Sequence, residues 1–281
     1  MRTDGTIACW GGDTKGQATP PSGTFTNVTI GVNHTCGVKT DGTASCWGDN
    51  RAGQASSPAG RFASVSAGDE HSCGLRVDGR AICWGDNRAG QVSPPLGIFT
   101  SVSAGSVHGC GLRTDGTALC WGGSGYGEAI PPAATFKSLV AGAARTCGIT
   151  VDGAVVCWGY NGSGQNRAPA GPFTEVAVGL EHTCAVKTDG TISCWGSDGW
   201  GQSRAPAGTF ASVAAGYFHS CGLKTDGTVV CWGELDGGRE ATSPSGKFTS
   251  ITAGVSHTCG LRQDARVECW GGAELLRPAQ D

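Results

Sequence analysis

Residues 25–58 read FTNVTIGVNHTCGVKTDGTASCWGDNRAGQASSP, and this stretch recurs along the chain with few changes. Its Cys-Trp-Gly tripeptide occurs eight times, and successive copies lie 37 residues apart, except the last pair at 38. A fixed spacing in this range indicates one supersecondary unit copied in tandem. A function specific to this protein should therefore lie where the copies differ. The copies begin at Cys9, Cys46, Cys83, Cys120, Cys157, Cys194, Cys231 and Cys269.

The repeated unit predicts short β-strands. Residues 25–30 alternate apolar and polar side chains with β-branched residues among them, and residues 35–39 and 43–47 do likewise. Residues 53–55 are a weaker candidate for a fourth strand, ended by the proline-containing link to the next repeat. We therefore predict an all-β fold in which each unit of about 37 residues is a four-stranded antiparallel meander.

The Thr40-Asp41-Gly42 link predicts a three-residue hairpin loop with glycine in the left-handed position. A register centred on Asp41 places Cys36 opposite Cys46, where β carbons can approach disulfide distance. Buried reduced thiols remain an alternative, and a zinc site using His34 with these two cysteines is a weaker one. The predicted pairs are Cys36 with Cys46, Cys73 with Cys83, Cys110 with Cys120, Cys147 with Cys157, Cys184 with Cys194, Cys221 with Cys231 and Cys259 with Cys269, leaving Cys9 as a free thiol.

The composition of the chain indicates its compartment and argues against some classes of partner. Seven cysteine pairs favour an oxidising compartment, so we expect an extracellular, periplasmic or cell-surface location, although residues 1–30 carry no secretion signal. The net charge of -3 and the absence of a basic run argue against nucleic acid as a partner. No apolar stretch approaches the roughly 18 residues that a membrane helix needs. We expect one monomeric domain over residues 1–281 without membrane insertion.

Three motifs of the repeat carry a family resemblance: G-x-x-H-T-C-G-L, then D-G, then C-W-G-x-N-x-x-G-Q. Together they resemble the repeat of the regulator of chromosome condensation superfamily over nearly the whole chain. The resemblance implies a seven-bladed β-propeller. The cysteine pairs resemble most closely the bacterial extracellular members and the plant crinkly receptor-kinase repeats.

The resemblance implies no single activity, because the superfamily includes a nucleotide exchange factor, a photoreceptor and a propeller-type β-lactamase inhibitor. A guanine nucleotide exchange or chromatin-binding factor is therefore one alternative for this chain. A structural repeat module of a longer surface protein is another.

A seven-bladed ring leaves one Cys-Trp-Gly strand too many. We predict that residues 14–19 close the blade built by residues 248–271. Residues 1–11 then become a redundant strand that competes with residues 266–270 for one place, and residues 273–281 form a tail.

Most aromatic and histidine side chains belong to the repeat itself, so we interpret them as structural. Six repeats carry a histidine at the place of His34, and Arg145 stands there in the seventh. Outside the repeat pattern we find no nucleophile with a base, no paired carboxylates and no metal or phosphate motif. We therefore predict no enzyme activity, no cofactor and no metal.

The aromatic residues left over lie in two loop types. Tyr126, Tyr160 and Trp200 follow Cys-Trp-Gly, whereas Tyr217 and Phe218 lie within Gly-x-x-His. In a meander these two loop types lie at the same end of the blade, so the five aromatics should gather on one face. Chance variation of loop tips remains an alternative.

Charged residues share these loops, a mixture typical of protein-binding surfaces. We predict a partner protein bound by the five aromatics together with Arg145, Glu181 and Asp198. Other charged residues in the same loops are Asp69, Glu70, Glu234, Asp236 and Arg239.

Overall fold

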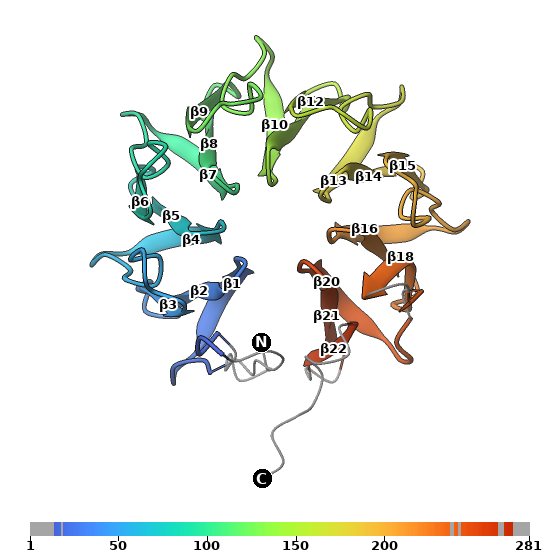
Figure 1. The fold of residues 1–281 in the computed structure, drawn as a ribbon, viewed down its shortest axis with the longest axis horizontal. Helices are drawn as coiled ribbons and strands as arrows, with labels where there is room; N and C mark the ends of the chain where they lie inside the picture. Colours follow the sequence, from blue (N-terminus) through green and yellow to red (C-terminus); the bar gives the residue numbers. More distant parts are fainter. Residues whose placement is uncertain (1–13, 18, 237–238, 241–242, 264–266, 272–281) are drawn as a thin grey trace.

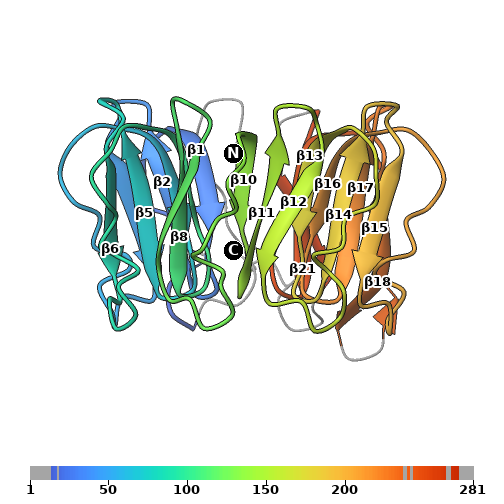
Figure 2. The same cartoon turned by 90° about the horizontal axis from the view of Figure 1, so that it is seen from above.

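The computed structural model describes residues 14–17, 19–236, 239–240, 243–263 and 267–271. Within them, seven small antiparallel sheets stand around a central axis (Figure 1), and loops lie at both ends of the sheets (Figure 2). Each sheet is one blade, and its strands follow chain order from the axis outward. The seven-unit all-β propeller expected from the repeat is therefore confirmed.

The first blade consists of β1 (Phe25–Ile30), β2 (His34–Lys39) and β3 (Ala44–Gly48). The second to fourth blades are β4 (Phe62–Ala67), β5 (His71–Arg76) and β6 (Ala81–Gly85); β7 (Phe99–Ala104), β8 (His108–Arg113) and β9 (Ala118–Gly122); and β10 (Phe136–Ala141), β11 (Arg145–Thr150) and β12 (Val155–Gly159). The fifth to seventh blades are β13 (Phe173–Val178), β14 (His182–Lys187) and β15 (Ile192–Gly196); β16 (Phe210–Ala215), β17 (His219–Lys224), β18 (Val229–Asp236) and β19 (Arg239–Glu240); and β20 (Phe248–Ala253), β21 (His257–Arg262) and β22 (Val267–Gly271).

A fourth strand in every blade is not confirmed. In the described residues only the sixth blade has one, the two-residue β19. Around Gln54 the chain instead forms a turn, in which Gly53 has a φ of 86° and the Gln54 side chain accepts a hydrogen bond from the Ala52 amide at 2.9 Å. The Gln54 carbonyl then accepts the indole N–H of Trp84 in the next blade, also at 2.9 Å. This backbone therefore joins blades instead of extending a sheet.

The predicted hairpin register is confirmed. Cys36 lies opposite Cys46, and their sulfurs are bonded. Cys259 lies opposite Cys269 in the same register, but the side chain of Cys269 and all of Cys9 lie outside the described residues. The disulfides among described residues are Cys36–Cys46, Cys73–Cys83, Cys110–Cys120, Cys147–Cys157, Cys184–Cys194 and Cys221–Cys231.

The repeated histidines join neighbouring blades. His34 is buried, and its Nε2 lies 2.8 Å from the hydroxyl of Ser72 in the next blade, which in turn donates to the Gln54 carbonyl. Burial lowers the pKa of His34 to about 4, so the ring is neutral near pH 7. The structural interpretation of the histidines is confirmed where they contact the next blade. His34, His108, His182 and His219 each lie 2.7 or 2.8 Å from a hydroxyl of that blade, whereas Gly109 occupies this place opposite His71.

The joint between the last and first blades is described only in part. Residues 14–17 form a turn, and the Gln17 carbonyl accepts the indole N–H of Trp47 at 3.0 Å, as Gln54 does for Trp84. This segment therefore takes the place of an inter-blade loop on the first blade. Of the segment 266–270, the described residues 267–270 belong to β22, which pairs with β21. Residues 1–11 and the tail 273–281 lie outside the described residues, so the predicted competition is untested.

Candidate functional site

Two loop types lie together at one end of each of the first six blades, where both loops are described, as the meander predicts. The amide that follows Cys-Trp-Gly donates to a carbonyl in the Gly-x-x-His turn of the same blade: Asp49 to Asn33 at 2.8 Å, and Tyr160 to Ala144 at 2.9 Å. We call this end of the ring the loop face. It comprises residues 31–33 and 49–54 of the first blade and the equivalent residues of the others.

Tyr126 and Tyr160 join two neighbouring blades on the loop face. Tyr126 follows β9 and Tyr160 follows β12, yet their ring centroids are 5.1 Å apart in an edge-to-face arrangement. Tyr126 is 63% exposed although it touches another aromatic ring. Its amide donates to a Glu128 carboxylate oxygen at 2.8 Å, which fixes the loop beneath the ring.

Trp200 and Phe218 occupy the next two blades. They are 55% and 42% exposed, respectively, and they are separated by 18 residues. Ser163 and Glu181, one repeat earlier, have the same separation, and the Ser163 hydroxyl lies 3.1 Å from a Glu181 carboxylate oxygen. Trp200 and Phe218 occupy the equivalent positions of the next repeat, so they lie on neighbouring blades of the loop face. We call Tyr126, Tyr160, Trp200 and Phe218 the aromatic sector.

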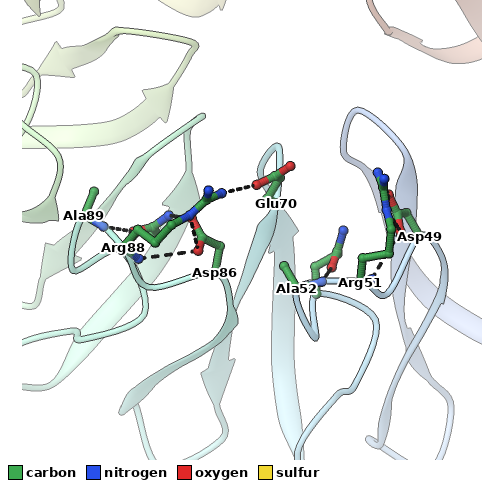
Figure 3. Close-up of polar contacts among 9 residues, drawn as sticks. Asp49, Arg51, Ala52, Glu70, Asp86, Arg88 and Ala89 are labelled. Carbon is green, nitrogen blue, oxygen red and sulfur yellow. Dashed lines mark hydrogen bonds and ion pairs between the residues drawn. The ribbon is translucent and has the colours of Figure 1, made fainter.

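The first two blades present a different surface at the same positions. Arg51 pairs with Asp49 at 2.6 Å, and Arg88 bridges Asp86 at 2.9 Å and Glu70 at 2.7 Å (Figure 3). The hydrogen bond from Arg51 lowers the pKa of Asp49 to about 2, so this carboxylate stays ionised. We call these five residues the ion-paired sector, in which each charge has a partner within the protein.

Arg145 does not lie on the loop face, so this part of the predicted site is wrong. Its side chain is 1% exposed, and its Nη2 donates to the carbonyls of Gly179, at 3.0 Å, and His182 in the next blade. Burial lowers the pKa of this guanidinium to about 9. Arg145 therefore joins blades, as the histidines do elsewhere, which its place in the repeat already indicated.

The two predicted carboxylates have local structural contacts. Glu181 accepts the Ser163 hydroxyl, whereas Asp198 accepts the Ser203 amide at 3.2 Å and the Arg204 guanidinium at 2.8 Å. Both are partly exposed and remain on the loop face between Tyr160 and Phe218 in chain order. They can therefore border a contact made by the aromatic sector.

Tyr217 points elsewhere than its neighbour Phe218. The two rings touch, with centroids 6.3 Å apart, but Tyr217 lines the central channel and not the outer part of the loop face. The channel encloses about 170 Å³ between the innermost strands of the blades (Figure 1). Sequence reasoning grouped both residues by their loop and missed the channel, although consecutive residues of a short turn commonly point in different directions.

The described residues contain no group of three or more His, Cys, Asp or Glu side chains placed to hold a metal ion. Within the same described ranges, no helix is long and apolar enough to cross a membrane. The zinc alternative also fails at its named cysteines, because Cys36 and Cys46 are bonded to each other.

Comparison with known proteins gave one family model and several similar structures. The model, described as the regulator of chromosome condensation (RCC1) repeat, matches residues 25–54, 62–91, 99–128, 136–165, 173–202 and 210–236. The comparison with curated proteins gave no match.

Two similar structures are plant receptor-kinase ectodomains. The CRINKLY WD40 ectodomain of Arabidopsis thaliana ACR4 is 28% identical, with a TM-score of 0.72 over 90% of this chain and 99% of that one. The Physcomitrella patens CR4 ectodomain is 27% identical, with a TM-score of 0.74 over 89% of this chain and 74% of that one. Prp20p of Saccharomyces cerevisiae is 17% identical, with a TM-score of 0.64 over 75% and 72%, and shares the fold alone.

Proposed function

Because the chain belongs to the regulator of chromosome condensation (RCC1) repeat family, we propose that it is a non-enzymatic propeller that binds another protein through its loop face. The observation that carries this proposal is the aromatic sector, in which Tyr126, Trp200 and Phe218 stay exposed and Tyr160 is half-buried, on a scaffold that buries most of its repeated aromatics. Aromatic anchors near the centre of a contact supply much of the binding energy in protein interfaces.

The arrangement of the aromatic sector supports a continuous contact surface. Tyr126 touches Tyr160, Trp200 and Phe218 follow on the next two blades, and Glu181 lies in the same blade as Trp200. A partner that covers this arc would remove four rings from water and leave Glu181 and Asp198 at its polar edge. Such an edge favours a partner with basic residues around an apolar centre.

The similar structures do not identify the partner protein. Prp20p binds Gsp1p and histones, but a protein 17% identical to this chain supports the fold only. The exchange-factor and chromatin-factor alternatives therefore rest on fold analogy. The aromatic sector, by contrast, is a feature of this chain's own residues.

We also propose that the protein is exported. Repeated disulfides are typical of oxidising compartments, and two similar structures at 27–28% identity are receptor ectodomains. Counting the thiols of unfolded protein, prepared without reductant from its natural host, tests this. We expect one reactive thiol, Cys9, whereas fifteen would contradict export.

Site-specific photo-crosslinking tests the binding face. A benzophenone amino acid placed at Tyr126 or Trp200 should yield a covalent adduct with the partner in cells or secretions of the source organism. The matched positions are Val77 and Val151, which are also exposed but lie in hairpins at the opposite end of the blades. Equal or stronger adducts from these two positions would refute the assignment of the loop face.

A further inference from the structure

Many of the side chains that line the loop-face end of the channel are small and apolar, and polar backbone atoms lie between them. Ala67, Ala104 and Ala141 line it at equivalent positions of successive blades, and each is followed by a glycine. A Cβ on Gly68 would lie 2.2 Å from the Gly105 carbonyl oxygen, so neighbouring blades can pack this closely only with glycine there. The channel wall therefore offers methyl groups, together with polar backbone atoms, to a molecule that enters.

Asp69 stands at the mouth of this channel without a positive partner. Its carboxylate hydrogen-bonds to the Ser106 side chain, and its charged neighbour Glu70 has the same sign. No ion pair to Lys or Arg joins Asp69 in the part of the chain that the structure describes, in contrast to Asp49 and Asp86. Burial raises the pKa of the Asp69 carboxyl, as expected for a partly desolvated acid that lacks a cation.

Tyr217 enters the same mouth from the opposite part of the ring. Its amide donates to the Val255 carbonyl at 3.0 Å, and its ring rests against Phe218, so two contacts fix it. Burial, and next the charge of Asp69, raise the pKa of the Tyr217 hydroxyl. A carboxylate and an aromatic ring thus line one opening of the channel.

We propose that the channel mouth binds a primary alkylammonium group, the chemistry of a lysine side chain, with the alkyl chain in the channel and the ammonium between Asp69 and Tyr217. The Asp69 carboxylate supplies a charge-assisted hydrogen bond, and the Tyr217 ring supplies a cation–π contact. The methyl-lined wall accepts methylene groups. Anions are disfavoured by Asp69 and Glu70, and the described residues lack the clustered ligands that a metal ion needs.

This site does not depend on the proposed protein partner, because a small molecule can test it. The probe is n-hexylammonium chloride, titrated into the whole protein by calorimetry and by saturation-transfer NMR, with n-hexanol as the uncharged probe of the same length. We expect saturable hexylammonium binding, at least about tenfold tighter than hexanol binding, because a hydrogen bond to a charged group strengthens binding by this order.

Two substitutions and one control variant test whether hexylammonium binds at the channel mouth. Asp69→Asn keeps the shape and removes the charge, so we expect it to weaken hexylammonium about tenfold and to leave hexanol unchanged. Tyr217→Leu should weaken hexylammonium by a smaller factor. Asp78→Asn, which removes an exposed carboxylate from a hairpin at the opposite end, should leave both probes unaffected.

Three results would overturn the proposal: no saturable binding of hexylammonium, equal affinities for the amine and the alcohol, or equal binding by the wild type and Asp69→Asn. Circular dichroism of each variant checks that the propeller stays folded. If the crosslinking experiment fails while hexylammonium binding follows this pattern, the channel site stands without the protein-binding function.

Discussion

The ion-paired sector and the aromatic sector occupy equivalent loops of one repeated scaffold, but they differ in how their side chains are satisfied. Arg88 has Asp86 and Glu70 as partners within the protein, so its charge is already neutralised. Trp200, at the position of the neighbouring Ala89, has a ring that stays 55% exposed. The fold therefore fixes the backbone of both sectors. The loop residues decide which sector keeps exposed side chains that a partner protein can bury.

The largest expected effect tests whether both sectors rest on one cooperative scaffold. Burial lowers the pKa of His34, His71, His108 and His219 to about 4 and that of His182 to about 3, from 6.5 in the unfolded chain. Between these values the unfolded chain binds more protons, so stability is full above about pH 6.5 and falls as the pH drops towards 4. Each fully titrating histidine lowers the free energy of unfolding by about 1.4 kcal/mol for each pH unit of acidification.

Acid titration followed by far-UV circular dichroism and tryptophan emission checks this prediction. Both signals should change in one transition that begins below about pH 6.5, with a total loss of several kcal/mol between pH 7 and pH 5. Two separate transitions would contradict the prediction of one cooperative scaffold, because the two sectors would then belong to parts of the protein that unfold independently.

Arg145→His tests the fourth blade, in which an arginine stands at the place of the repeated histidine. The Nε and Nη1 atoms of Arg145 are buried without a hydrogen-bond partner, whereas a histidine would reach the Thr183 hydroxyl as His34 reaches Ser72. Leaving a buried donor unsatisfied costs about 1–3 kcal/mol, so we expect the variant to be more stable by that order at pH 7.

Urea denaturation of Arg145→His gives the free energy of unfolding, and the added histidine should also steepen its loss in acid. His71→Arg is the reverse change and should destabilise the protein. A less stable Arg145→His variant would mean that the buried arginine stabilises its blade interface.

The smallest expected effect is in the ion-paired sector. Arg88→Ala removes an exposed side chain whose ion pairs lie in water, and such pairs contribute little to stability. We expect an unchanged urea midpoint and an affinity for the partner within about twofold of the wild type. A large loss of affinity for the partner would mean that the binding surface covers both sectors.

The sequence predicted the scaffold well because each repeated residue has one physical role. The spacing of Cys36 and Cys46 around a three-residue loop determines the register, and glycine at Gly37 is required because a Cβ there would lie 2.6 Å from the Phe25 ring. The sequence could not show that a regular fourth strand is missing, because the backbone around Gln54 makes an inter-blade hydrogen bond that only the tertiary structure reveals.

The candidate site was predicted only in part. The shared face of the two loop types followed from the meander, but Arg145 was assigned to the surface because charge was weighed above its place in the repeat. The separation of Tyr217 from Phe218 depends on the curvature of the ring, which places one position of each turn at the channel. No local sequence pattern encodes that curvature.

The most direct test of the account compares the two sectors in one binding measurement. Once crosslinking has identified the partner, its dissociation constant is measured for the wild type, for Trp200→Ala with Phe218→Ala, and for Arg51→Ala with Arg88→Ala. Loss of two aromatic anchors should weaken binding at least about a hundredfold, whereas the arginine variant should stay within about twofold. Equal losses in the two variants, or a loss confined to the arginine variant, would contradict the assignment of binding to the aromatic sector.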